Sequence, residues 1–267
     1  MEMDIKIGCA GWYYKDWVGS FYPKNLDPSK YLSYYSEYFD FTEVNSTFYS
    51  LPSLEMVDNW YKRVPNDFRF IVKVWKEITH KSNPEDLNYL IDEFFERLNA
   101  LNEKINFYLF QFPPWFKYSE KHINHLKNII SLIPPRIKCV VELRDNSWFK
   151  DRILEEIKKD RRIFIGTSYL QGINPYYHAN QTIYYIRLIG DRDLSSFSYI
   201  QRHKEKEINT IIKKVTELQK NGTLNEIFII VNNHYTGFAP ETANELKNKF
   251  GKSYRSFLSQ KRLSDFI

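Results

Sequence analysis

The sequence predicts a (β/α)8 barrel, one domain over residues 1–267 in which eight parallel strands alternate with helices. Two observations predict this fold: eight short runs rich in β-branched and aromatic residues, and helical patterns between them. The average of about 33 residues per strand–helix unit is typical of such barrels. A doubly wound open sheet is the alternative, but residues 8–12 lack the Gly-x-Gly-x-x-Gly spacing of a phosphate-binding first turn.

The eight predicted strands are dominated by Ile, Val, Phe and Tyr, which favour extended structure. They are residues 5–9, 39–45, 68–75, 107–112, 137–143, 163–167, 183–188 and 227–232. Because helical patterns lie between them, their order is the alternation that a barrel requires.

Six helices are predicted from apolar residues that recur three or four positions apart. Ser53 and Ser119 precede two of them as N-cap residues, and Asn83 with Pro84 begins a third that runs through Leu98. The others are a helix after Ser147, a long helix from about Leu194 to Gln219 that stops near Asn221 and Gly222, and a helix from Pro240 through Leu246.

The composition excludes several classes of protein. The chain has 20 Tyr, 20 Phe and 6 Trp but only 9 Gly, so it is not collagen-like, of low complexity or disordered. The net charge is +5, and acidic and basic residues are mixed along the chain, which is typical of a solvated surface rather than of a dedicated nucleic-acid binder. Most aromatic residues are expected in the core.

The sequence predicts a cytoplasmic protein. Cys9 and Cys139 form no Cys-x-x-Cys motif and no zinc-binding spacing, as is typical of a reduced cytosolic chain. The first residues lack the basic and apolar segments of a secretory signal. The longest uncharged run, residues 163–186, is interrupted by Gln, Asn and Pro and does not predict a transmembrane helix.

Polar residues stand near the C-terminal ends of the predicted strands, where the active site of a barrel forms. They are Glu43, Asn45, Lys73, Gln111, Glu142, Arg144, Arg187, Asn232, Asn233 and His234. Charges inside a barrel are costly unless they are paired, and here two acids face three bases. The pattern predicts a pocket for an anionic or polar ligand, and a purely structural ion-pair network is the alternative.

The same positions carry a resemblance to the YecE-like family, domain of unknown function 72. Residues 43–49, Glu-Val-Asn-Ser-Thr-Phe-Tyr, match the family's Glu-x-Asn-Ser-Thr-Phe-Tyr block, its most specific motif here. Further matches span nearly the whole chain: residues 8–17 and 21–23, Trp60, Pro65, residues 68–70, Lys73, Thr79, His80, residues 111–114, residues 142–144, Ser147, Trp148, residues 232–234 and residues 237–239. The resemblance implies a TIM barrel with its site on the C-terminal face, and no settled activity.

Two positions depart from the family pattern. The His that usually follows Glu-x-Arg is Asp145, and the usual Arg-x-His-Gly on the seventh predicted strand has Ile189 in place of its His. A general acid or base supplied by either His in the family is therefore absent from this chain.

We predict a hydrolase-like enzyme that acts on a phosphate- or sugar-containing substrate. The predicted catalytic residues are Glu43, Glu142 and Lys73; a carboxylate beside Arg144 or Lys73 should stay ionised, which favours a base or nucleophile over an acid. The predicted ligand-binding residues are Asn45, Arg144, Arg187, Gln111, Asn232, Asn233, His234, Trp12, Tyr49, Trp75 and His80. Trp12, Tyr49, Trp75 and Trp148 are the aromatic candidates for stacking on a sugar or base.

Two other functions fit the same residues. One is a non-catalytic module that binds an anion or nucleotide, and the other is a phosphoesterase with one weakly bound metal at Glu43, Glu142 or His234. We predict no cofactor and no multi-zinc site, because only His80 and His234 among the six His residues are expected at the barrel mouth. The expected partner is a small anionic or sugar-like ligand; nucleic acid is a weaker candidate, and a membrane is not expected.

Overall fold

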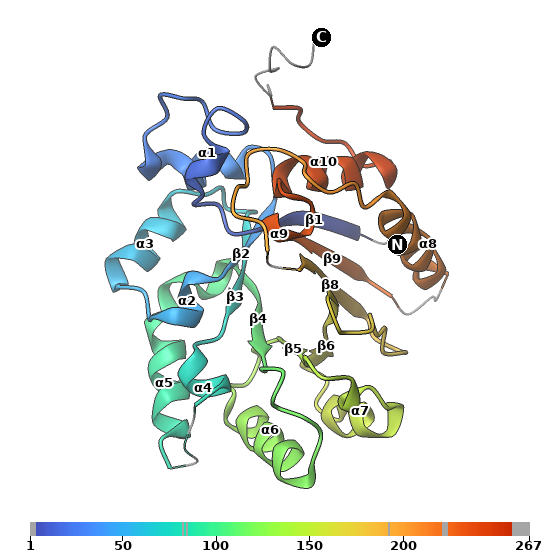
Figure 1. The fold of residues 1–267 in the computed structure, drawn as a ribbon. Helices are drawn as coiled ribbons and strands as arrows, with labels where there is room; N and C mark the ends of the chain where they lie inside the picture. The colour runs from blue at the N-terminus through green and yellow to red at the C-terminus, as the bar shows by residue number, and fades with distance from the viewer. Residues whose placement is uncertain (1–3, 82, 84, 192, 221–223, 258–267) are drawn as a thin grey trace.

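Parallel strands form a ring at the centre of the molecule and helices surround it (Figure 1). The computed structural model describes residues 4–81, 83, 85–191, 193–220 and 224–257. Within these residues nine strands form one sheet in the order β6-β5-β4-β3-β2-β1-β9-β8-β7. They are β1 (Asp4–Ala10), β2 (Phe41–Val44), β3 (Arg69–Lys73), β4 (Ile105–Gln111), β5 (Cys139–Glu142), β6 (Ile163–Ile165), β7 (Thr167–Leu170), β8 (Ile183–Gly190) and β9 (Glu226–Val231). The architecture is a nearly closed, TIM-like α/β barrel, as predicted.

The sixth predicted strand is divided into two. Gly166 separates β6, which pairs with β5, from β7, which pairs with β8. The Gln181 side chain accepts a hydrogen bond from the Ile165 amide at 2.6 Å and donates one to the Ile165 carbonyl at 3.1 Å. This amide therefore satisfies backbone groups of β6 as a neighbouring strand would, which explains why the prediction of a single strand over residues 163–167 was wrong.

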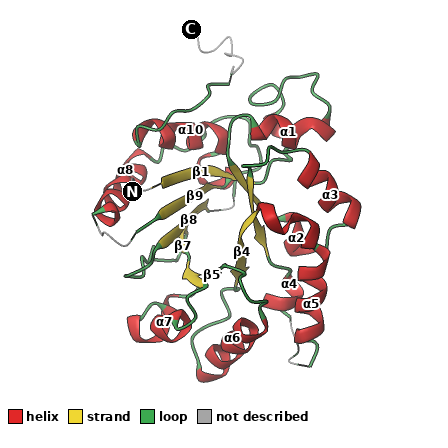
Figure 2. Cartoon of the chain, turned by 180° about the vertical axis from the view of Figure 1, so that it is seen from behind, coloured by secondary structure: helices red, strands yellow, loops and turns green. Residues whose placement is uncertain are grey.

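Helices form the outer layer, which is seen from behind in Figure 2. They are α1 (Tyr31–Ser36), α2 (Ser46–Tyr49), α3 (Leu54–Lys62), α4 (Lys76–Thr79), α5 (Leu87–Arg97), α6 (Glu120–Leu132), α7 (Asp151–Lys158), α8 (Glu205–Gln219), α9 (Asn233–Thr236) and α10 (Ala239–Lys249). Short 3-10 turns are η1 (Lys15–Trp17), η2 (Pro28–Lys30), η3 (Asn99–Lys104) and η4 (Asn146–Trp148). In the described part of the chain, no helix is long and apolar enough to cross a membrane.

The helix boundaries confirm some predictions and correct others. Ser53 and Ser119 are N-caps whose side chains accept hydrogen bonds from Met56 N and His122 N, at 3.1 and 3.2 Å. The helix predicted from Asn83 begins only at Leu87, and Pro84 lies outside the described residues. Ser147 belongs to η4, and the helix predicted after it begins at Asp151.

The long helix predicted from Leu194 is wrong over its first half, because α8 begins at Glu205. The preceding segment bonds to other parts of the chain: Phe197 N donates to Asp16 Oδ2 at 2.8 Å, and Gln201 N donates to Thr236 O at 2.7 Å. Amides used in this way cannot form helical hydrogen bonds. The predicted stop at Asn221 and Gly222 lies outside the described residues.

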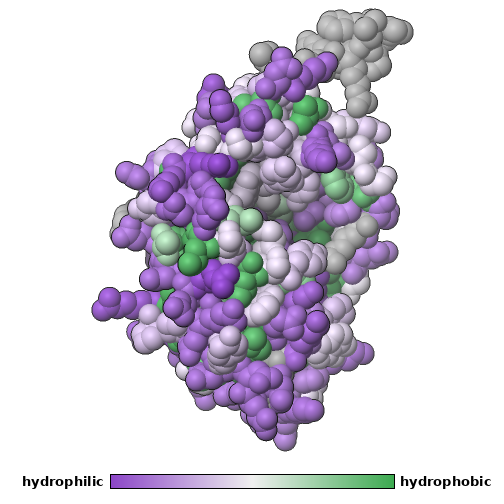
Figure 3. Space-filling view, turned by 90° about the vertical axis from the view of Figure 1, so that its left-hand side faces the viewer, coloured by the Kyte–Doolittle hydropathy of each residue, from purple (hydrophilic) through white to green (hydrophobic). Residues whose placement is uncertain are grey.

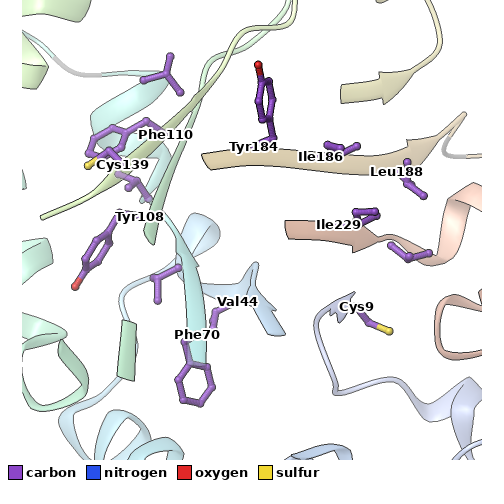
Figure 4. Close-up of a cluster of buried hydrophobic side chains, with 14 of the residues drawn as sticks. Cys9, Val44, Phe70, Tyr108, Phe110, Cys139, Tyr184, Ile186, Leu188 and Ile229 are labelled. Carbon is purple, nitrogen blue, oxygen red and sulfur yellow. The ribbon is translucent and has the colours of Figure 1, made fainter. Parts of the chain in front are cut away.

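Two hydrophobic clusters fill the structure, one on each side of the sheet. The larger lies between the strands and the helices, and Figure 4 shows part of it, with Val44, Phe70 and Ile186. The smaller fills the barrel interior, where the Phe228 ring makes edge contacts with Phe41 and Phe107, at 5.4 and 5.1 Å between centroids. Hydrophilic side chains cover most of the face in Figure 3, where hydrophobic ones appear in small separate groups.

Candidate functional site

Each polar residue of the site follows apolar residues on the same face of its strand. On β8, Ile183 and Tyr185 belong to the interior cluster, and Arg187 is the next residue on that face. The alternation of side chains along a strand repeats this arrangement on β2, β3, β4 and β5, which contribute Glu43, Lys73, Gln111 and Glu142. Because the strands are paired in parallel, their C-terminal ends lie at the same height in the barrel, with Gln111 directly opposite Glu142. A polar layer therefore lies above an apolar floor.

Arg187 connects the two buried glutamates. Its Nε and Nη2 donate to the two carboxylate oxygens of Glu43 at 2.8 and 2.6 Å, and its Nη1 donates to Glu142 Oε2. This fork geometry is the strongest form of the arginine–carboxylate pair. Burial alone would lower the pKa of Arg187, but Glu142 and Glu43 outweigh it and raise the pKa above its usual value.

Further side chains also bind the two glutamates. Glu43 accepts hydrogen bonds from Tyr185 OH at 2.5 Å and from Asn45 Nδ2 at 2.8 Å, and Glu142 Oε1 accepts one from Arg144 Nε at 2.6 Å. Both residues are 0% exposed. Burial tends to raise the pKa of Glu142, but the adjacent Arg144 and Arg187 hold it well below its usual value. Both oxygens of each glutamate are therefore bonded inside the protein.

Lys73 is the third cation of the layer. Its side chain is 7% exposed, and its Nζ lies 3.9 Å from the centroid of the Phe48 ring. Neither a hydrogen bond nor an ion pair of this amine is present within the described ranges of the chain. Burial, together with repulsion from Arg187 and Arg144, lowers its pKa from 10.5 to about 7. Lys73 is therefore a buried amine close to the midpoint of its titration at neutral pH.

A cavity of about 300 Å³ opens beside Lys73. Its lining residues are Tyr14, Asn45, Tyr49, Lys73, Arg187, Ile189, Phe197, Asn232, Asn233 and His234. The predicted site residues Asn45, Tyr49, Lys73, Arg187 and the Asn232–His234 segment therefore meet at one cavity, to which β2, β3, β8 and the end of β9 contribute.

Several buried donors among the described residues lack acceptors, and two of them belong to predicted site residues. Arg144 Nη2 and Asn233 Nδ2 are fully enclosed and make no hydrogen bond in the described part of the structure. The other groups of these side chains are used: Arg144 Nε binds Glu142, and Asn233 Oδ1 accepts from Trp17 Nε1 at 3.1 Å and from Ala239 N at 3.0 Å. A buried donor without a partner is costly, so its presence at a site favours a ligand that accepts hydrogen bonds.

Several predicted ligand residues do not line this cavity. Trp12 packs edge-on against Trp60 with 5.7 Å between centroids, Trp75 packs against the outer core, and Gln111 Nε2 donates to Phe112 O at 2.7 Å. Trp148, proposed for stacking, is fully buried and donates from Nε1 to Phe116 O at 2.6 Å. These four residues and Arg144 do not line the cavity; among the aromatic candidates Tyr49 does, and it is 67% exposed.

His80 lies at a different cavity. It lines a space of about 520 Å³ together with Thr79, Trp115 and residues of α6. Its ring contacts Phe48, the same ring that lies against Lys73. Burial, with repulsion from Lys73 and Arg144, lowers the pKa of His80 to about 4, so the ring is neutral at pH 7.

Sequence reasoning missed Tyr185 and Phe197 as members of the site. Tyr185 binds Glu43 from inside the barrel, and its position two residues before Arg187 on the same strand face was the available signal. Phe197 reaches the cavity from the segment mispredicted as helix, and no pattern in the sequence indicated this.

The two departures from the family pattern have different surroundings. Ile189 lines the cavity, so an apolar side chain occupies the place of the family's usual His. Asp145 lies at the N-cap of η4, where its Oδ1 accepts from Ser147 N at 3.0 Å.

A metal centre is not evident in the side-chain arrangement. No group of three or more His, Cys, Asp or Glu side chains that could hold a metal is present in the part of the chain that the structure describes. Glu43 and Glu142, the ligands considered for a metal, have both oxygens bonded to arginines, Tyr185 or Asn45.

Known proteins resemble this chain in sequence and in fold. Residues 6–265 match the family model described as "Protein of unknown function DUF72". The chain is 25% identical over 271 residues to UPF0759 protein YunF of Bacillus subtilis, covering 91% of this chain and 93% of YunF. It is 29% identical over 145 residues to UPF0759 protein YecE of Escherichia coli K12, covering 54% of this chain and 50% of YecE.

Solved structures give the same result. The crystal structure of the DUF72 family protein TM1631 from Thermotoga maritima superposes with a TM-score of 0.78 and 25% identity, over 93% of this chain and 100% of that chain. The DUF72 family protein EF0366 from Enterococcus faecalis gives a TM-score of 0.75 at 22% identity, over 94% and 99% of the two chains, and shows the same fold. From this match over nearly its whole length, the chain belongs to the DUF72 family of proteins of unknown function.

Proposed function

We propose that this protein is an enzyme of the hydrolase or lyase type whose substrate is a small phosphate- or sugar-containing anion bound at the barrel mouth. The observation that carries the proposal is Lys73, a buried amine that faces the cavity without an ion-pair partner among the described residues. Arg144 and Arg187 already neutralise Glu142 and Glu43. The charge of Lys73 is therefore left for a ligand.

An anionic group fits this surplus of positive charge. Asn233, which lines the cavity, offers in its buried Nδ2 a further donor without a hydrogen-bond partner within the described residues. Phosphate and carboxylate oxygens accept several hydrogen bonds at once and gain most from desolvated cationic donors. Asn232, Asn45 and the exposed Tyr49 line the same cavity and suit the hydroxyl groups of a sugar.

The chemistry is assigned to Lys73 rather than to the glutamates. General acid or base catalysis needs a group that can reach the substrate, but Glu43 and Glu142 are buried, and each of their carboxylate oxygens is bonded to another side chain. Their role in this proposal is to hold Arg187 and Arg144 in place. A lysine with a pKa of about 7 can instead accept a proton or attack as a neutral amine.

A non-catalytic anion-binding module is the second candidate, and the saturated glutamates favour it, because the charged layer then serves only to bind. Lys73→Arg separates the two functions. An enzyme loses at least about a hundredfold in turnover of sugar phosphates while phosphate affinity stays within about tenfold. If the protein is a binding module, Lys73→Arg has the same phosphate affinity as the wild type, and neither protein turns over sugar phosphates.

Phosphate binding gives the first test. We expect inorganic phosphate to bind the wild-type protein and to bind Lys73→Met at least about tenfold more weakly. The variant lacks the positive charge of Lys73, which neither Glu43 nor Glu142 pairs with. Isothermal titration calorimetry measures both affinities. The matched control is Lys62→Met, which removes an exposed lysine paired with Asp58 on α3. Equal phosphate affinity in wild type and Lys73→Met would contradict the proposal.

A further inference from the structure

Three lysines are buried in the described residues, and their surroundings differ. Lys104 Nζ donates to the carbonyl oxygens of Tyr61, Val64 and Pro65 at 3.0, 2.9 and 3.1 Å, and Lys247 Nζ donates to Tyr38 O at 2.9 Å. These bonds explain why each lysine is retained inside the protein. Lys73 has no such bond and faces a cavity. It is therefore the buried lysine whose position the packing of the described residues does not explain.

The surroundings of Lys73 suit a nucleophile better than a fixed charge. Two buried arginines stand next to it, so a third permanent cation adds repulsion. Burial of the amine and repulsion from the two arginines both favour the neutral form of Lys73. The neutral amine has a free electron pair and is the reactive form of lysine. Phe48 covers the amine on one side with a ring face at 3.9 Å, which limits access of water there, and the opening of the cavity leaves another side for a substrate.

The bonding of the glutamates narrows the covalent chemistry that remains. A retaining glycosidase needs one free carboxylate as nucleophile and another as acid, and neither Glu43 nor Glu142 is free. A neutral lysine amine reacts characteristically with aldehydes and ketones. Asn233 lines the same cavity as Lys73, and its unpartnered donor Nδ2 suits an acidic group on the same molecule.

We propose that Lys73 forms an imine with a substrate that carries both a carbonyl carbon and a phosphate or carboxylate group, a step that rests on the proposed anion-binding enzyme. The Nζ electron pair attacks the carbonyl carbon, and one of the two amine protons passes to the carbonyl oxygen to give a carbinolamine. The C–O bond then breaks as the nitrogen electron pair forms the C=N bond, and the oxygen leaves as water with the second amine proton. Amine and carbonyl thus give imine and one water, with no oxidant or reductant.

The acidic group of the substrate supports this step electrostatically. A protonated imine keeps a positive charge at the position of Lys73, close to Arg187 and Arg144. A phosphate or carboxylate bound in the cavity, beside Asn233, offsets this charge, so an anionic carbonyl compound should react much better than a neutral one.

Reductive trapping tests the proposal directly. The protein is incubated with dihydroxyacetone phosphate and sodium cyanoborohydride, which reduces an imine to a stable secondary amine, and peptide mass spectrometry locates the adduct. We expect an adduct at Lys73 that forms at least about tenfold faster than with dihydroxyacetone, that inorganic phosphate suppresses, and that Lys73→Arg abolishes. The labelling rate should rise as pH increases through about 7, since the neutral amine reacts. Lys62→Arg, at an exposed ion-paired lysine, is the control and should not change labelling.

The outcomes separate this inference from the function on which it rests. Phosphate binding that depends on Lys73, without an adduct from dihydroxyacetone phosphate or from pyruvate as carboxylate probe, overturns the imine and leaves the anion site standing. Absence of both phosphate binding and adduct overturns both proposals. Labelling spread over exposed lysines at the rate seen for Lys73, or equal rates with dihydroxyacetone and its phosphate, also overturns the imine.

Discussion

Replacing Arg187 by Met should lower the free energy of unfolding by about 3–5 kcal/mol, the usual loss when one partner of a buried ion pair is removed. The substitution leaves Glu43 and Glu142 without the guanidinium that binds three of their four oxygens. Both glutamates are buried, so water cannot replace the lost bonds without opening the barrel. Urea denaturation of wild type and variant measures the difference.

Controls separate this effect from a general loss of an arginine. Arg255→Met removes an arginine paired with Glu37 at the surface, where both side chains are more than half exposed, and should change stability little. Adding Glu43→Gln and Glu142→Gln to Arg187→Met should recover part of the loss, because neutral amides are less costly to bury than unpaired carboxylates. A loss below about 1 kcal/mol for Arg187→Met would show that the three charges are not coupled as the distances indicate.

Lys73→Met and Lys104→Met should change stability in opposite directions. Lys73 has no hydrogen-bond or ion-pair partner among the described residues, and its lowered pKa means that the folded protein disfavours its charged form. Met should therefore raise the free energy of unfolding at pH 7 by about 1–2 kcal/mol. Lys104→Met leaves three carbonyl oxygens without their charged donor and should lower it by about 2–4 kcal/mol.

The increase in free energy of unfolding expected for Lys73→Met should become smaller as the pH rises. The folded pKa of about 7 lies below the unfolded value near 10.5, so the unfolded chain binds more protons between these values. The free energy of unfolding of the wild type therefore rises with pH across that window. The difference in free energy of unfolding between Lys73→Met and the wild type becomes smaller as it does so. Denaturation at pH 6, 8 and 10 checks the trend. A Lys73→Met variant less stable than wild type at every pH would instead assign Lys73 a structural role.

The barrel was predictable because each strand and most helices carry a local signal. β-branched and aromatic runs located the strands, and serine N-caps located α3 and α6. The failures come from contacts between distant segments. Gln181 forms the hydrogen bonds that a neighbouring strand would otherwise make with β6. Asp16 and Thr236 accept hydrogen bonds from amides of the segment before α8, so those amides do not form helical hydrogen bonds. No window of local sequence contains such information.

The site was predictable to the level of position but not of role. The period of two along a strand placed Glu43, Lys73, Glu142 and Arg187 in one layer, as observed. Which charges pair depends on distances that sequence does not give, so the glutamates were predicted as catalytic although their oxygens are all bonded. Sequence likewise does not show that Trp148 stacks on Phe116 or that Trp12 packs edge-on against Trp60.

The titration of Lys73 itself is the most direct test of an unpaired lysine in an anion site. Lysine side chains labelled with ¹³C at Cε report their own protonation by NMR, and the signal missing from Lys73→Arg identifies Lys73. We predict a midpoint at about pH 7 that moves upward when inorganic phosphate is added, because a bound anion stabilises the ammonium form. A midpoint near the ordinary value of 10.5 that phosphate leaves unchanged would contradict the assignment of Lys73 as an unpaired lysine in an anion site.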